Sequence, residues 1–177
     1  VDDANPDGHS FKTELEALHH KVRVISNPTR IGLTHSKVVG THGVTSPVIV
    51  FAEPHCVFNR FWLEPLLERM MMVPDTTVLL PMIDVIRLPY KQESLNTSQL
   101  YAQAGMNMGG FHLNTLMFDW ENLRTRNSTY QEPDPFPSPA MPGGILAISR
   151  AWWERSGKYD TGMTAWGGEN IEMSIRV

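Results

Sequence analysis

Four consecutive apolar residues, at positions 48–51, constrain the fold more than any other stretch of the chain. A run that is apolar on both faces is typical of a strand buried on both sides, as in the parallel sheets of α/β proteins. An amphipathic helical face follows over residues 62–71, and a second β-rich run comes next at residues 77–80. Strands that alternate with helices predict an α/β domain with a mainly parallel sheet.

Further elements are expected on the N-terminal side of this unit. Apolar residues at helical spacing predict a helix over residues 11–21, with Ser10 as its N-cap, and another over residues 30–39. Between them, residues 22–25 form a short β-rich run that ends before an Asn-Pro pair. This half of the chain therefore continues the alternation of helix and strand.

The pattern is less even on the C-terminal side. Residues 84–87 can form an extended segment, and the pattern weakens over residues 89–142, which predicts mostly a surface connection. The prolines between residues 133 and 142 make the end of this stretch stiff and extended. Residues 143–148 then read as a strand opened by two glycines. Ser149 is expected to cap a short helix that Gly157 can end.

The composition is that of one ordinary globular domain, and it argues against several classes of function. The chain has 177 residues with a net charge of −4, and its Lys and Arg residues form no cluster of the nucleic-acid-binding type. No apolar run approaches the roughly 18 residues that span a bilayer, and the N-terminus lacks the features of a signal peptide. Cys56 is the single cysteine, so an internal disulfide is impossible. Asn96 and Asn127 begin glycosylation triplets, which support a luminal location only weakly.

Glu53 and His55 stand two residues apart, directly after the apolar strand. In open α/β sheets, ligands bind beyond the carboxyl ends of the strands. A carboxylate and an imidazole at this spacing can both reach one divalent cation, which would neutralise a nucleotide diphosphate. A loop with a buried histidine explains the same residues without any ligand.

The run from Trp166 to Glu172 carries two glycines, a carboxylate and a carboxamide. Glycine lets the backbone approach a ligand closely. The tryptophan face can stack on the C–H edges of a sugar, and Glu169 with Asn170 offers acceptors and donors for its hydroxyls. A glycine turn that enters a helix is the simpler interpretation of this stretch taken alone.

Two further charged residues stand where a nucleotide could lie. Asp3 comes at what reads as the end of a strand, where a carboxylate can accept hydrogen bonds from uracil or ribose. Arg30 can pair with a diphosphate through its planar guanidinium. A solvated loop acid and an ordinary arginine near a helix N-terminus remain open as the alternatives.

The order of these features along the chain resembles the catalytic domain of the polypeptide N-acetylgalactosaminyltransferases, which begin mucin-type O-glycosylation. The resemblance covers nearly the whole chain, and its most specific blocks lie around residue 53 and at residues 166–172. The matching stretches are, in order, Val1-Asp2-Asp3, residues 22–25, Arg30-x-Gly32-Leu33, Phe51-x-Glu53-x-His55-Cys56-x-x-Asn59, residues 62–67, residues 81–86, Gly109-Gly110-Phe111, Met141-Pro142-Gly143-Gly144, and Gly157-x-Tyr159-Asp160-x-Gly162-Met163 through Trp166-Gly167-Gly168-Glu169-Asn170-x-Glu172.

The resemblance implies a GT-A glycosyltransferase fold, an α/β fold with a Rossmann-like, mainly parallel sheet flanked by helices. It implies a retaining enzyme that moves GalNAc from UDP-GalNAc to Ser or Thr of a protein acceptor, with Mn2+ as cofactor. It also implies the Golgi lumen and a type II membrane anchor outside this chain. Residues 1–177 would then be a partial catalytic domain, incomplete at both ends and without the lectin domain. We expect this segment to be inactive alone.

Carried over position by position, the resemblance implies a role for each matching residue. Glu169 and Asn170 would be catalytic residues that face the sugar and the acceptor. Glu53 and His55 would hold the metal. The remaining positions would bind substrate: Asp3 and Arg30 at the nucleotide, Lys37, Pro54, Gly143 and Gly144 at the donor, and Trp166 as a wall of the donor site.

The chain departs from the family pattern at the donor side, which keeps a second hypothesis open. Glu53 stands where the family has Asp, and Pro54 offers no backbone N–H to a donor oxygen. His35 and Lys37 replace a basic pair, which weakens the positive charge available to a diphosphate. The alternative is therefore a catalytically impaired or inactive pseudo-transferase that binds glycoprotein or nucleotide through the same fold. A chain-extending galactosaminyl-type GT-A transferase is a third, weaker possibility.

Overall fold

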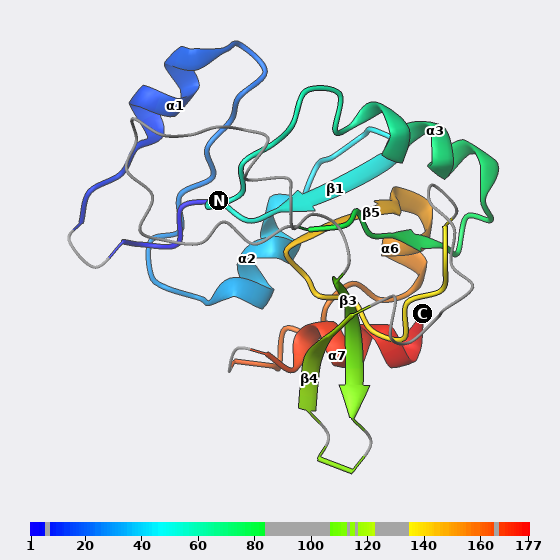
Figure 1. The fold of residues 1–177 in the computed structure, drawn as a ribbon. Helices are drawn as coiled ribbons and strands as arrows, with labels where there is room; N and C mark the ends of the chain where they lie inside the picture. Colours follow the sequence, from blue (N-terminus) through cyan, green and yellow to red (C-terminus); the bar gives the residue numbers. More distant parts are fainter. Residues whose placement is uncertain (6–7, 84–106, 113, 116, 123–134, 165–166) are drawn as a thin grey trace, which may run out of the picture.

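The computed structural model describes residues 1–5, 8–83, 107–112, 114–115, 117–122, 135–164 and 167–177. Helices and strands alternate from α2 to β2, whereas the other elements follow one another in groups of one type; Figure 1 shows their arrangement. In chain order the elements are α1 (Lys12–Leu18), α2 (Leu33–Gly40), β1 (Val48–Ala52), α3 (Glu64–Met72), β2 (Val78–Leu79), β3 (Asn107–His112), β4 (Met117–Asn122), β5 (Ile145–Ser149), α6 (Arg150–Arg155) and α7 (Glu169–Arg176).

A three-stranded sheet in the order β1-β5-β2 forms the centre of the structure. β5 pairs with both neighbours in antiparallel fashion, with Ala52 opposite Ile145 on one side and Val78 opposite Ile148 on the other. All five β5 residues are buried. β1 and β2 run in the same direction, but β5 separates them. The expectation of a mainly parallel sheet is therefore not confirmed by the described strands, because an apolar run reports burial and says nothing about the direction of its partner.

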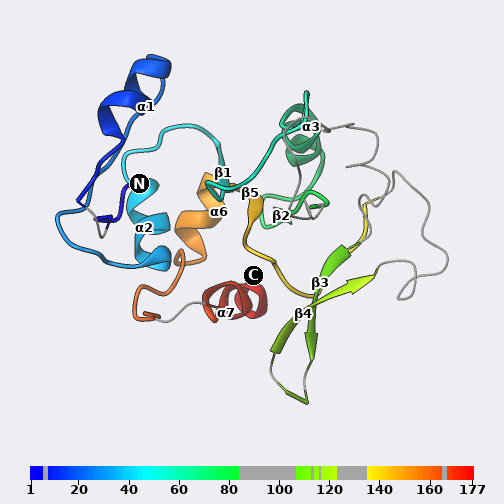
Figure 2. The ribbon, with the colours of Figure 1, turned by 60° about the vertical axis from the view of Figure 1, so that its left-hand side comes forward.

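A second, two-stranded sheet consists of the antiparallel hairpin β3–β4. The predicted surface connection over residues 89–142 is wrong for these strands. Gly109 pairs with Trp120 and Gly110 with Asp119, and glycine has a low intrinsic preference for strands, which hides such a segment from sequence patterns. Figures 1 and 2 show the hairpin projecting away from the three-stranded sheet. The extended segment predicted at residues 84–87 lies outside the described residues.

The predicted helices are present, with shorter bounds. α1 begins at Lys12 and has no buried residue, and both views place it at the periphery. Ser149 caps α6 as predicted, since its Oγ accepts from Trp152 N at 3.0 Å. Residues 22–25 form no strand; beside them a single parallel bridge joins Asp2 and Ser26. Among the helices of the described part of the chain, none has the length and apolarity to cross a membrane.

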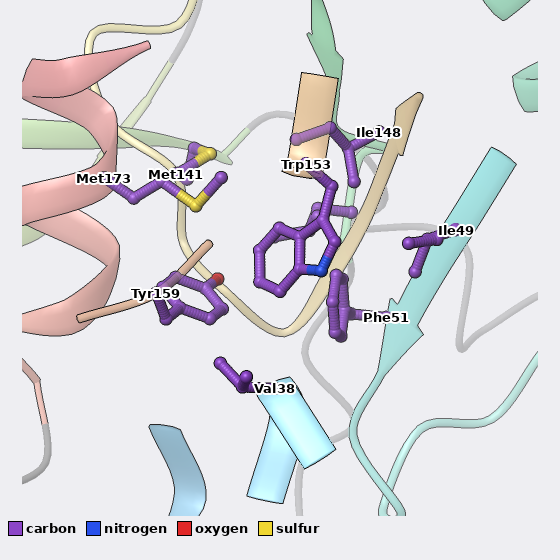
Figure 3. Packing of buried hydrophobic residues seen from close by; sticks show 9 residues of the cluster. Val38, Ile49, Phe51, Met141, Ile148, Trp153, Tyr159 and Met173 are labelled. Carbon is purple, nitrogen blue, oxygen red and sulfur yellow. The ribbon is translucent and has the colours of Figure 1, made fainter. Parts of the chain in front are cut away.

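The main core lies between the sheet and helices α2, α6 and α7. The rings of Phe51, Trp153 and Tyr159 meet at its centre, with centroids 4.9 Å apart for Phe51–Trp153 and 5.4 Å apart for Trp153–Tyr159 (Figure 3). The indole N–H of Trp153 donates to Thr41 Oγ1 at 3.0 Å, so this buried polar group is satisfied. The other members of the cluster are Val38, Ile49, Met141, Leu146, Ile148 and Met173. This core supports the segments that carry the predicted site residues.

Candidate functional site

Three segments meet at the turn Gly143–Gly144, which enters β5. Lys37 Nζ, from α2, donates to the carbonyl oxygen of Gly143 at 3.1 Å. The backbone N–H of Glu53, directly after β1, donates to the carbonyl oxygen of Gly144 at 3.0 Å. Asn170, in the first turn of α7, packs against Gly143. The structure thus brings together six of the predicted site residues: Lys37, Glu53, Gly143, Gly144, Glu169 and Asn170.

Glu53 and His55 sit on a tight turn at the end of β1. The N–H of Cys56 donates to the carbonyl oxygen of Glu53 at 3.2 Å, which closes a four-residue turn with Pro54 at its second position. Proline is favoured there because its fixed φ suits the turn. The ring of Pro54 is exposed. A local conformational reason therefore exists for a proline at this place.

The side chains of Glu53 and His55 on this turn point toward each other. Glu53 Oε2 and His55 Nε2 lie 3.2 Å apart, and the imidazole is 79% exposed, so a ligand can reach it. Two atoms that coordinate one octahedral divalent cation at about 2.1 Å lie about 3 Å from each other. Glu53 and His55 fit that requirement as they stand. Within the described residues no group of three or more His, Cys, Asp or Glu side chains is placed to hold a metal, so this pair supplies at most part of a coordination shell.

The carboxylate of Glu169 and the carboxamide of Asn170 form one hydrogen-bonded unit. Glu169 is fully buried, and its Oε2 accepts from the backbone N–H of Gly167 at 2.9 Å. Its Oε1 accepts from Asn170 Nδ2 at 2.9 Å. Asn170 Oδ1 in turn accepts from the hydroxyl of Tyr159 at 2.7 Å. Both side chains are therefore held in one orientation before any ligand binds.

Only glycine fits at position 143. Its φ is +74°, a region that other residues rarely adopt. A Cβ at this position would lie 2.1 Å from Asn170 Nδ2, far inside van der Waals contact. The missing side chain is what lets the Asn170 carboxamide lie against the backbone of the turn.

Lys37 is the cation of this cluster. Burial lowers the pKa of Lys37, and the nearby negative charges of Glu53 and Glu169 offset only part of that effect. Its ammonium group also lies 5.6 Å from the centroid of the Tyr159 ring. The hydrogen bond to the Gly143 carbonyl holds the Lys37 ammonium in place. From there its positive charge compensates the carboxylates of Glu53 and Glu169. Its predicted contact with a diphosphate stays a prediction.

Asp3 and Arg30 lie near the other end of α2. Asp3 accepts from the N–H of Ile31 at 3.0 Å, from the N–H of Gly32 at 2.8 Å and from Asn27 Nδ2 at 2.8 Å. Burial alone would raise the pKa of Asp3, but these hydrogen bonds outweigh it and lower the pKa below its ordinary value. Asp3 thus fixes the backbone that leads into α2, whereas Arg30 is exposed. Their contacts with a nucleotide remain predictions.

Trp166 lies outside the described residues. The structure also identifies a residue to which the sequence analysis assigned no role, Tyr159, whose hydroxyl holds Asn170. Tyr159 falls within a stretch that matches the family pattern, but neither charge nor periodicity links it to Asn170, because the contact arises only when the turn after α6 packs against α7.

Curated proteins and solved structures both include relatives of this chain from one family of proteins. No family model matches the chain. Polypeptide N-acetylgalactosaminyltransferase 4 of Mus musculus is 38% identical over 183 residues, which cover 100% of this chain and 30% of that protein. Inactive polypeptide N-acetylgalactosaminyltransferase-like protein 5 of Mus musculus is also 38% identical, over 165 residues that cover 92% of this chain and 36% of that protein. Among solved structures, a crystal structure of GalNAc-T7 with UDP, GalNAc and Mn2+ superposes with a TM-score of 0.70 at 23% identity, over 93% of this chain and 30% of that one.

The fold is thus the GT-A glycosyltransferase fold, of mixed α/β class. By sequence identity over its whole length, the chain belongs to the polypeptide N-acetylgalactosaminyltransferase family. It spans about a third of the length of the curated relatives named above. Since the transferase and the inactive protein match it equally well, overall identity does not separate the two hypotheses on activity, and the site residues have to do so.

Proposed function

We propose that the protein carrying this chain transfers GalNAc from UDP-GalNAc to Ser or Thr hydroxyls of protein acceptors, and that residues 1–177 form part of its catalytic domain. The observation that carries the proposal is the convergence of Glu53–His55 and Glu169–Asn170 on the turn Gly143–Gly144. A Golgi-lumenal location with a type II membrane anchor is part of the same proposal, which the family membership supports.

Glu53 and His55 are the residues that would hold Mn2+. Their facing atoms already stand at a separation suited to one octahedral cation. When bound, the metal would neutralise the charge that builds up on the UDP leaving group. Asp3 and Arg30 would hold the nucleotide, and Trp166 would form a wall of the donor site.

Glu169 and Asn170 would serve the sugar and the acceptor. The buried carboxylate of Glu169 is anchored at both oxygens, so it can present a fixed negative charge beside the anomeric centre without any reorganisation. Gly143 and Gly144 have no side chains, so the donor would be able to approach their backbone closely beside Glu169 and Asn170. Retention of the anomeric configuration is part of the same proposal.

The second candidate is a pseudo-transferase that binds ligand without turnover. Glu53 favours it, because its extra methylene moves the carboxylate relative to the aspartate of the family pattern, and metal–ligand distances tolerate only about 0.2 Å. The equal identity to a relative named as inactive is compatible with this candidate. The 3.2 Å approach of Glu53 to His55 argues for the enzyme, since the turn has absorbed the longer side chain.

The two candidates differ in the effect of reverting the turn. The full-length protein is assayed with UDP-GalNAc, Mn2+ and a Ser/Thr peptide, alongside Glu53→Asp, Pro54→Ser and the double variant. An active enzyme gives Mn2+-dependent transfer that Glu53→Asp changes by less than about tenfold. An inactive parent whose double variant gains transfer indicates a decayed site. Absence of UDP-GalNAc binding with every divalent cation tested would refute the transferase and a nucleotide-binding pseudo-transferase, and absence of glycoprotein binding as well would refute the second candidate altogether.

A further inference from the structure

The hydroxyl of Tyr159 is the one link between the aromatic core and the Glu169–Asn170 unit for which the described residues show a hydrogen bond. Its ring packs against Phe51 and Trp153 (Figure 3). Its oxygen donates to Asn170 Oδ1 at 2.7 Å. Within the described part of the chain, the other side-chain hydrogen bonds around this unit reach backbone atoms: Ser174 Oγ donates to the carbonyl oxygen of Asn170, and Lys37 Nζ donates to that of Gly143. A change at this hydroxyl therefore acts on Asn170 directly.

The donors and acceptors of this chain of side chains can be arranged in only one way. A carboxylate accepts hydrogen bonds and donates none, so the amide nitrogen of Asn170 must face Glu169. Asn170 Oδ1 is then left facing Tyr159, and the tyrosine hydroxyl must donate. The first Nδ2 hydrogen is used by Glu169, and the second has no partner among the described residues. Tyr159 thus determines where that second hydrogen points.

Tyr159 is itself firmly placed. Its side chain is 2% exposed, and the turn before it is tied to α7 by Arg176, which donates to the carbonyl oxygens of Ser156 and Lys158. Burial raises the pKa of Tyr159, and the negative charge of Glu169 raises it further, so the hydroxyl stays protonated and remains a donor. The residue has the rigidity that a positioning role requires.

We propose that Tyr159 is a positioning residue, which fixes the Asn170 carboxamide so that its second N–H recognises an oxygen of the donor sugar. The inference rests on the proposed function, because it assumes a UDP-sugar in the site. It assigns Tyr159 to recognition of the sugar and leaves the nucleotide to other residues.

The test compares a sugar nucleotide with the bare nucleotide. In the full-length protein with Mn2+, calorimetry measures binding of UDP-GalNAc and of UDP to wild type and to Tyr159→Phe. We expect about tenfold weaker binding of UDP-GalNAc, the size of one lost hydrogen bond, and unchanged binding of UDP. Equal losses for both ligands, or none for either, would overturn the proposal.

Thr41→Val is the matched control. It also removes a buried hydroxyl from the same core, one that accepts from Trp153 Nε1 at 3.0 Å and donates to the Val38 carbonyl at 2.8 Å, but it has no contact with Asn170. It should lower the melting temperature while both affinities stay at wild type. If the wild-type protein binds neither UDP-GalNAc nor UDP, the proposed function itself is refuted.

A crystal structure of Tyr159→Phe then decides the role of Tyr159. A reoriented Asn170 carboxamide supports the positioning role, and an unchanged carboxamide overturns it.

Discussion

Replacing Gly143 by alanine tests the architecture of the site most directly. Two separate costs follow from the structure. The alanine must adopt φ near +74°, and its Cβ would stand 2.1 Å from Asn170 Nδ2 and 2.6 Å from Oδ1. Because the backbone of the turn is held by hydrogen bonds from Lys37 and Glu53, we expect the Asn170 side chain to move instead.

The size of the effect can be built from these two costs. A left-handed conformation costs a residue with a Cβ about 1–2 kcal/mol. Displacing the carboxamide breaks its hydrogen bond with Tyr159, worth about 1 kcal/mol, and its hydrogen bond with the Glu169 carboxylate, worth about 1.5–3 kcal/mol. The sum is about 3.5–6 kcal/mol. At about 3 °C per kcal/mol for a domain of this size, it corresponds to a decrease of about 10–18 °C in melting temperature.

Gly43→Ala separates the backbone cost from the displacement of Asn170. Gly43 has φ +73°, almost the value at Gly143, but nothing lies within 4 Å of a Cβ placed there. We expect this control to lose only about 3–6 °C, the cost of the backbone conformation alone. Thermal unfolding of both variants, with UDP-GalNAc affinity measured in parallel, gives the comparison. Equal melting temperatures for the two alanine variants would refute the reasoning.

Two further variants test features outside this turn. Asp3→Asn should lower stability at pH 7 by about 1–2 kcal/mol, because the N–H groups of Ile31 and Gly32 lose a charged acceptor. Because the pKa of Asp3 is lowered, its contribution to stability is present above the ordinary value of 3.8 and is lost as the pH falls through the folded-state pKa. Between about pH 2 and 7 the free energy of unfolding should therefore change less with pH in the variant than in wild type. The same pH dependence in both proteins would contradict this. Ser149→Ala should cost about 1–2 kcal/mol in thermal unfolding, since the N–H of Trp152 loses its cap, and an unchanged melting temperature would show that the cap is dispensable.

The sequence predicted the elements whose pattern is local. The apolar run of β1, the amphipathic face of α3 and the Ser149 cap of α6 all depend on neighbouring residues, and all three are present. It failed where the structure depends on distant residues. The direction of β5 relative to β1 and the pairing of two glycines in β3 with β4 are tertiary facts without a short-range signal.

The candidate site also has features that the sequence predicted and features that only the structure revealed. Residue type and spacing singled out the blocks around Glu53 and Glu169 as candidates, and the family resemblance then favoured a ligand site over a plain turn; their roles stay predictions. The contact that leaves no room for a Cβ at Gly143, and the hydroxyl that holds Asn170, required coordinates. A tyrosine eleven positions before an asparagine carries no periodic signal, since the two meet across a turn and a helix.

The central position of β5 has a consequence for the synthesis of this chain. β1 and β2 each find their partner in a strand that leaves the ribosome after both of them. At about 5–20 residues per second, the interval between the end of β1 and the start of β5 is on the order of 5–20 seconds. During that time the apolar side chains of β1 and its unpaired backbone groups are exposed to other nascent chains. We therefore expect a nascent chain to depend on chaperones until β5 has emerged from the ribosome, and to depend on them less afterwards.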